Sequence, residues 1–189
     1  MTERGQERVF AAIALTGETQ RMLAEWSREM QTRIPFRKWT WHEDLHITLQ
    51  FFGDVDIAQL PQLHEALATA GKQIKPFTLK LGMPDLFGVP ERPRVWWIQP
   101  EGELEQLNIL QQRVQQECEP LGFKPEQRPY APHITIARKY AGSHPFIPPS
   151  TDSFPPSSEW IVEEMVLYHT RLGQLPMYEQ AMRFPLGRS

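Results

Sequence analysis

A four-residue motif occurs twice in the chain and constrains its fold more than any other feature. The two copies are His46-Ile47-Thr48-Leu49 and His133-Ile134-Thr135-Ile136, separated by 87 positions in a chain of 189 residues. Each copy alternates polar and aliphatic residues, which predicts a β-strand with an imidazole and a hydroxyl on one face and aliphatic side chains on the other. Two such strands would direct two histidines and two threonines into one cleft.

The spacing of the two copies predicts an internal duplication. Two matches in a chain of this size are expected by chance on the order of once in several hundred sequences, so the pair is more specific than a lone histidine. The copies lie a little under half the chain length apart, and two copies are too few for a solenoid. We therefore expect two similar α+β lobes within a single domain that spans residues 1–189.

Hydrophobic periodicity predicts helices and strands that are interspersed along the chain. Helices are expected at Glu18–Gln31, Ile57–Ala70 and Glu103–Glu119. Strands are expected at Arg8–Leu15, Trp39–Phe52 (ended by Gly53-Asp54), Phe77–Leu81, Val95–Ile98, the second histidine motif, Trp160–His169 and Tyr178–Phe184.

Composition limits the partners and the compartment. The net charge is −3, so no global basic field exists to hold long nucleic acid, and an RNA ligand is expected to be met at an end or over a few nucleotides. Cys118 is the only cysteine, which excludes an intrachain disulfide. No apolar run approaches about 18 residues, and no leader-like segment opens the chain, so we expect a cytoplasmic protein without membrane contact. A monomer is expected as well.

The paired histidines suit acid–base chemistry at a phosphate. Hydrolysis of a cyclic phosphodiester requires one group to deprotonate water and another to protonate the leaving oxygen, and histidine titrates near neutral pH. Thr48 and Thr135 lie two residues beyond the histidines, where they are expected to donate hydrogen bonds to the phosphate oxygens. This scheme requires no metal and no cofactor. No glycine-rich phosphate loop is present, so ATP use is not expected.

Several segments together resemble the 2H phosphoesterases, and specifically the RNA 2′,3′-cyclic phosphodiesterases once called 2′-5′ RNA ligases. The two histidine motifs carry the resemblance most strongly, and it extends over the whole chain. The matching segments are Val9–Ile13, Leu45–Gly53, Arg92–Trp97, Arg128–Arg138 and Tyr178–Leu186.

The resemblance implies a bilobal α+β fold in which pseudo-duplicated antiparallel sheets, flanked by helices, surround a central cleft. It also implies hydrolysis of an RNA terminal 2′,3′-cyclic phosphate to a 2′-phosphate, with His46 as proton donor and His133 as proton acceptor. The sequence alone does not order the two histidines. The reverse reaction, which joins RNA ends through a 2′-5′ linkage, is expected as a side activity.

The same resemblance places Phe51 and Arg138, each five residues beyond its histidine, against the nucleotide base and phosphate. Strict strand alternation disagrees, since it sends both side chains to the opposite face unless the strand ends or bulges first.

Three alternatives stay open at this stage. A metal hydrolase would combine the two histidines with Glu43 or Asp44, although no compact ligand cluster is visible. A binding module would hold phosphorylated RNA ends without turnover. A related phosphoesterase would act on a small cyclic nucleotide, and no sequence feature separates this enzyme from one that acts on RNA.

Overall fold

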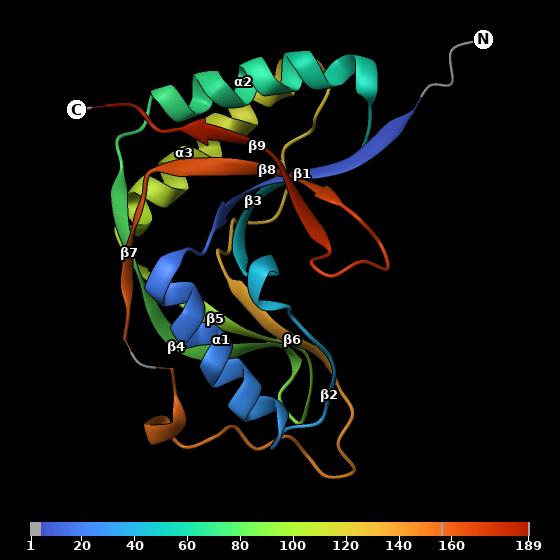
Figure 1. The fold of residues 1–189 in the computed structure, drawn as a ribbon, viewed down its shortest axis with the longest axis vertical. Coiled ribbons are helices and arrows are strands. Elements are labelled where there is room, and N and C mark those ends of the chain that lie inside the picture. Colours follow the sequence, from blue (N-terminus) through green and yellow to red (C-terminus); the bar gives the residue numbers. More distant parts are fainter. Residues whose placement is uncertain (1–4, 156, 189) are drawn as a thin grey trace.

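Strands of alternating burial form one antiparallel sheet in the computed structural model, which describes residues 5–155 and 157–188 (Figure 1). Within these residues the strand order is β7-β4-β5-β6-β3-β1-β8-β9, and the short β2 also pairs with β6. The strands are β1 (Gln6–Ala14), β2 (Phe36–Trp39), β3 (His46–Asp56), β4 (Phe77–Val89), β5 (Arg92–Gly102), β6 (Ile134–Tyr140), β7 (Glu159–Val162), β8 (Glu164–Thr170) and β9 (Tyr178–Pro185). The helices are α1 (Gly17–Gln31), α2 (Leu60–Lys72) and α3 (Leu104–Cys118).

The sheet has a pseudo-twofold arrangement. Exchanging β3 with β6 also exchanges β1 with β5, β8 with β4 and β9 with β7, and leaves the strand order unchanged. The order strand–helix–strand recurs as β1-α1-β3 and β5-α3-β6. The expected α+β fold with two similar halves is therefore confirmed.

The two halves meet where β3 pairs with β6, at Ile47 opposite Ile134. Both side chains are fully buried in the hydrophobic core. Each isoleucine belongs to one of the two histidine motifs, so this pair fixes the relative register of the motifs.

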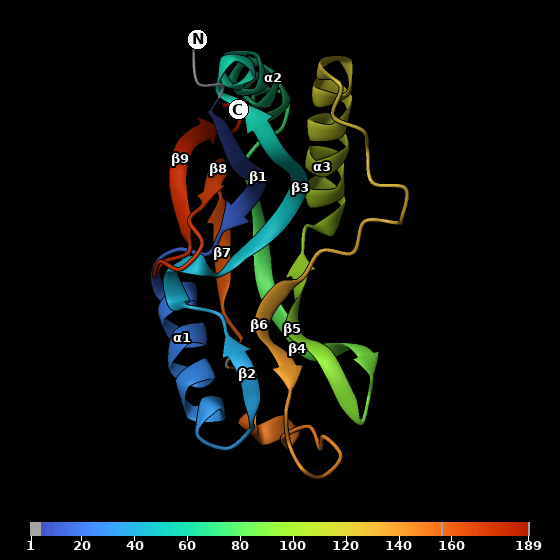
Figure 2. The same ribbon diagram turned by 90° about the vertical axis from the view of Figure 1, so that its right-hand side faces the viewer.

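Helices α1 and α3 each cover the half of the sheet that does not contain the strand preceding them. Helix α1 follows β1 but packs on the other half, where Trp26 contacts Trp96 of β5 at a ring distance of 5.1 Å. Helix α3 follows β5 but packs with α2 beside β3. In Figure 2, α1 accordingly lies beside the lower half of the molecule and α3 beside the upper half. No helix among the described residues is long and apolar enough to cross a membrane.

For two of the expected strands, the predicted bounds are wrong. Trp39–Phe52 is divided by a short 3-10 turn at His42–Asp44, and the strand that follows continues past Gly53, which adopts φ 76° within the strand instead of ending it. Trp160–His169 is two strands, since β7 pairs with β4 whereas β8 pairs with β1. Two consecutive polar residues, Glu163 and Glu164, interrupt the alternation where the chain passes between the two halves.

A bulge in β3 turns two consecutive residues toward the core. Ala12 pairs with Thr48 and Ala11 with Gln50, so Leu49 is an extra residue without a partner on β1. Gln50 shares the core-facing side of Ala11 and is 7% exposed. Neither end of its amide has a hydrogen-bond partner among the described residues.

We predict that Gln50→Leu stabilises the fold. The substitution removes a buried amide without partners and keeps a similar volume, which is worth about 1–3 kcal/mol in the free energy of unfolding. Urea denaturation measures the difference. Gln112→Leu, at an exposed position of α3, is the control and is expected to change little. A Gln50→Leu protein less stable than the parent would contradict the prediction.

Candidate active site

The register of β3 and β6 brings the two motifs together in a crossed arrangement. Because the strands are antiparallel and Ile47 faces Ile134, His46 lies opposite Thr135 and Thr48 opposite His133. Directly opposite side chains of such strands have Cβ atoms about 4.5–5.5 Å apart. The two isoleucines point into the core, so all four polar side chains share the other face.

Matching bulges bring Phe51 and Arg138 to this same face. Leu49 is the extra residue in β3, and Ile136 is the extra residue in β6, since Trp97 pairs with Thr135 and Trp96 with Ala137. Each bulge lies three residues beyond its histidine and reverses the alternation. Strict alternation sends both side chains to the opposite face only where no bulge intervenes, and these two bulges keep them on the histidine face.

The contacts of these two side chains agree with that placement. The Phe51 ring lies 5.4 Å from the ring of Phe10, which itself lies 5.0 Å from His46. The Arg138 guanidinium donates a hydrogen bond from Nη2 to Thr135 Oγ1 at 3.4 Å. Phe51 is 70% exposed, so it is not a core residue.

Both histidine rings are held in the same tautomer. Nδ1 of His46 lies 2.6 Å from the carbonyl oxygen of Asp44, and Nδ1 of His133 lies 2.8 Å from that of Ala131. A carbonyl only accepts, so Nδ1 carries the proton in each ring. The Nε2 atoms are then the nitrogens that gain or lose a proton. In the neutral ring of His46, Nε2 accepts a hydrogen bond from Thr48 Oγ1 at 3.1 Å.

His46 occupies the more enclosed of the two positions. Phe10, Tyr168 and Tyr178 surround its ring at centroid distances of 5.0, 5.9 and 5.2 Å. Burial among these rings lowers the pKa of His46 to about 4, against the opposing effect of the hydrogen bond to Asp44, and the charges of His133 and Arg138 lower it further. His46 is therefore neutral near pH 7 in the free protein.

His133 lies on the opposite side of the pseudo-twofold axis, beside Phe87 and Trp97. Ring centroids lie 5.1 and 5.8 Å away, and the two aromatic rings stack on each other at 4.7 Å. Burial lowers the pKa of His133, the hydrogen bond to the Ala131 carbonyl opposes this, and Arg138 lowers it as well.

Hydrogen bonds to Asp44 hold the end of the β8–β9 connection and the start of β9 beside His46. Its carboxylate is buried and accepts hydrogen bonds from the backbone amides of Met177 and Tyr178, each at 2.9 Å. Tyr178 in turn packs its ring edge against His46. Asp44 thus supports His46 through its backbone carbonyl and through its side chain.

The carboxylates named in the metal-hydrolase alternative are engaged elsewhere. The Asp44 carboxylate faces the two backbone amides, and Glu43 Oε2 accepts a hydrogen bond from the Trp41 indole at 3.0 Å. Across residues 5–155 and 157–188, no group of three or more histidine, cysteine or acidic side chains has the geometry to hold a metal ion.

Comparison with known proteins identifies the family. The sequence profile of the 2′-5′ RNA ligase superfamily matches residues 19–174. The chain belongs to the 2′-5′ RNA ligase superfamily. The resemblance drawn from the two histidine motifs is thereby confirmed.

Two curated relatives in the superfamily are named RNA 2′,3′-cyclic phosphodiesterase. The protein of Bacillus subtilis is 36% identical over 155 residues, which cover 82% of this chain and 83% of the relative. The protein of Geobacillus stearothermophilus is 41% identical over 178 residues, which cover 94% of this chain. The chain spans only 56% of the Geobacillus protein's length.

A solved structure agrees with the fold. TT0787 of Thermus thermophilus superposes with a TM-score of 0.77 at 29% identity, covering 95% of this chain and 97% of the other. The superfamily fold therefore extends over nearly the whole chain.

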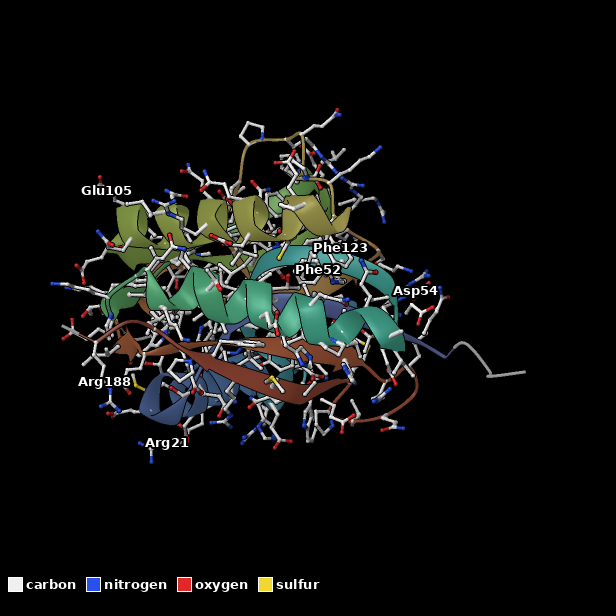
Figure 3. The ribbon with its side chains drawn as sticks, turned by 90° about the horizontal axis from the view of Figure 1, so that it is seen from above. Arg21, Phe52, Asp54, Glu105, Phe123 and Arg188 are labelled. Carbon is white, nitrogen blue, oxygen red and sulfur yellow. The ribbon has the colours of Figure 1, made fainter. Side chains whose placement is uncertain are left out.

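The face that carries the histidines opens into a cleft of about 1080 Å³. Thr48, Phe51, His133 and Arg138 line it, together with the segment 124–131 between α3 and β6. Figure 3 shows Phe123 beside Phe52 of β3, at a ring distance of 5.0 Å. The hydroxyl of Tyr130 donates to the Thr48 carbonyl at 2.8 Å. These two contacts hold both ends of the segment against β3.

Several residues of the site lie outside the two histidine motifs and were not predicted in the roles that they have here. Phe10, Tyr168 and Asp44 reach His46 from β1, β8 and a 3-10 turn, and the segment 124–131 is irregular in backbone. Phe10 lies on β1, which pairs with β3, Asp44 precedes β3, and Tyr168 reaches the site from β8 as the partner of Phe10.

We predict that Asp44→Ala destabilises the protein, because it leaves the part-buried amides of Met177 and Tyr178 without their acceptor. The expected loss in the free energy of unfolding is about 1–3 kcal/mol for each unpaired group, measured by urea denaturation. Asp44→Asn retains one acceptor and should lose less. Asp152→Ala, at an exposed position, is the control. Equal stability of the Ala variant and the parent would contradict the role assigned to the carboxylate.

We also predict a pH dependence of stability that originates at His46. Its folded pKa of about 4 lies below the ordinary value of 6.5, so the unfolded state binds the proton more tightly. The stabilisation is fully present above pH 6.5 and is lost as the pH falls toward 4, by up to about 3 kcal/mol.

Chemical denaturation at several pH values between 7 and 4 tests this dependence. His46→Gln should flatten the decline in the free energy of unfolding over that window. His144→Gln, which alters an exposed ring, should leave the decline as it is in the parent. An identical decline in His46→Gln and the parent would refute the assignment.

Proposed function

We propose that this chain hydrolyses the 2′,3′-cyclic phosphate at an RNA end to a 2′-phosphomonoester, with RNA ends and short oligonucleotides as substrates. The names of its superfamily relatives support this activity. The observation that carries the proposal is the crossed pairing of the two motifs, in which two histidines with available Nε2 atoms and two threonine hydroxyls share one face of the sheet.

In the proposed reaction, water attacks phosphorus in line with the P–O3′ bond. His133 Nε2 accepts the proton of the water, and His46 Nε2 donates a proton to O3′ as that bond breaks, which leaves the phosphate on O2′. Thr48 and Thr135 donate hydrogen bonds to the non-bridging oxygens, where negative charge increases in the transition state. No step of this scheme uses a metal or a cofactor.

The low pKa of His46 makes proton donation dependent on the substrate. A buried ring with a pKa of about 4 is neutral in the free protein. A phosphate anion beside it offsets the charges of Arg138 and His133 and favours the protonated form. The donor therefore gains its proton as the anionic substrate binds, and the free protein keeps no charge in this buried position.

Phe51 and Arg138 are proposed to hold the nucleotide. An exposed aromatic ring beside the catalytic face is suited to stacking on a base, and a guanidinium near Thr135 is suited to a phosphate oxygen. The reverse reaction, 2′-5′ ligation, follows from microscopic reversibility as a secondary activity. Cytoplasmic location, a monomeric state and independence of ATP stay predictions from the sequence.

The deciding experiment incubates EDTA-treated protein with a short RNA that ends in a 2′,3′-cyclic phosphate and follows the terminus by phosphorus NMR. A 2′-phosphomonoester supports the proposal and identifies the cleaved bond. Hydrolysis of a mononucleotide alone would favour the small-nucleotide enzyme. Binding without turnover would favour the binding module, and activity only after zinc or manganese is added would favour the metal hydrolase.

We predict that His46→Ala and His133→Ala each lower kcat/KM on this RNA by roughly two to four orders of magnitude, because each removes one of the two proton-transfer groups. The rate is measured by separation of the phosphorylated products, and the circular dichroism spectrum checks the fold. His144→Ala is the matched control. Activity equal to that of the parent in either variant would contradict the two-histidine mechanism.

A further inference from the structure

The cleft carries positive charge that the reacting phosphate alone does not account for. Its lining contains five cationic side chains and one carboxylate, in a chain whose net charge is −3. The cations are Arg94, Lys124, Arg128, Arg138 and Lys139, and the carboxylate is Glu126. The single ion pair among them, Arg128 with Glu126 at 3.3 Å, is exposed and therefore weak. The surface charge is thus unevenly distributed, because cationic side chains are concentrated at this cleft.

Three of these cations lie at or next to irregularities of the strand backbone. Arg94 is an extra residue in the β4–β5 hairpin, where Val95 pairs with Phe87 and Pro93 with Gly88. Arg138 follows the bulge at Ile136. Lys139 adopts φ 61°, a left-handed conformation that is unusual for lysine. In a regular strand Arg138 and Lys139 would point to opposite faces, yet both line the cleft.

The remaining two cations lie on the segment 124–131, which is held against β3 at both ends. Phe123 packs on Phe52, and the Tyr130 hydroxyl donates to the Thr48 carbonyl. Figure 2 shows this segment as a loop that runs from the end of α3 to the start of β6. Lys124 and Arg128 are therefore exposed on a segment that is anchored to β3 near both ends.

We propose that Arg94, Lys124 and Arg128 bind backbone phosphates of the RNA strand that leads in the 5′ direction from the cyclic-phosphate nucleotide. This inference rests on the proposed function and extends it from the reacting phosphate to the strand that carries it. The volume of about 1080 Å³ reaches the upper end of what small-molecule sites enclose, which leaves room beyond one nucleotide. The preferred substrate is then an oligonucleotide, and a mononucleotide cyclic phosphate is a poor one.

The test compares an eight-nucleotide RNA ending in a 2′,3′-cyclic phosphate with the mononucleotide 2′,3′-cyclic AMP. The parent is expected to show a kcat/KM at least tenfold higher on the RNA. In the triple variant Arg94→Ala, Lys124→Ala, Arg128→Ala, the ratio of the two kcat/KM values should fall tenfold or more. Arg113→Ala, on an exposed position of α3 outside the cleft, is the control and should keep the ratio of the parent.

Salt dependence supplies a second readout. Binding of the RNA is measured by fluorescence anisotropy at several salt concentrations. Each phosphate that a variant no longer neutralises should reduce the slope of log K against log salt by about 0.7 for a single strand. The triple variant should therefore reduce the slope by about 2, whereas Arg113→Ala should not. These three positions are exposed, so the variants are expected to fold.

The outcomes separate this inference from the proposed function. An equal loss on both substrates, no preference of the parent for the RNA, or an unchanged salt slope in the triple variant would overturn it. If the parent hydrolyses neither substrate, the proposed function fails, and the anisotropy slopes still decide whether these cations bind the strand.

Discussion

The pairing of Ile47 with Ile134 is the interaction on which the site depends. It joins the two halves of the sheet at the pseudo-twofold axis, and its burial holds the two strands in one register. A slip by one residue would exchange core and cleft faces along a whole motif, so the hydrophobic core itself enforces the position of the histidines. Burial of two apolar side chains thereby fixes the arrangement of four polar ones.

The two histidines lie in different surroundings, which is what the proposed reaction requires of a proton donor and a proton acceptor. Both histidines share a tautomer and a bulge three residues further on, but three aromatic rings and the Asp44 contacts enclose His46, whereas Phe87 and Trp97 border His133 from one side. The two halves also differ five residues beyond each histidine, where one half has Phe51 and the other has Arg138. A duplicated scaffold can thus supply one position suited to a base and another suited to a phosphate.

The sequence predicted the parts of the site that depend on local alternation, and missed those set by distant partners. His46 and Thr48 share a face because a strand has period two, and the helix bounds were predicted to within a few residues because apolar periodicity is local. The bulges at Leu49 and Ile136 are defined only by pairing with β1 and β5. The contacts of Asp44 lie more than 130 positions further along the chain. The division of Trp160–His169 likewise depends on distant partners, because β7 pairs with β4 in one half and β8 pairs with β1 in the other.

The exchange of helices between the halves has a mechanical consequence for the cleft. Helix α1 packs on the half that contains β5, through Trp26 and Trp96, and α3 packs with α2 beside β3. A hinge motion between the halves would have to separate these buried contacts together, at a cost far above thermal energy. The distance between the two imidazoles is therefore set when the chain folds, and the proposed reaction would need little reorganisation of the site.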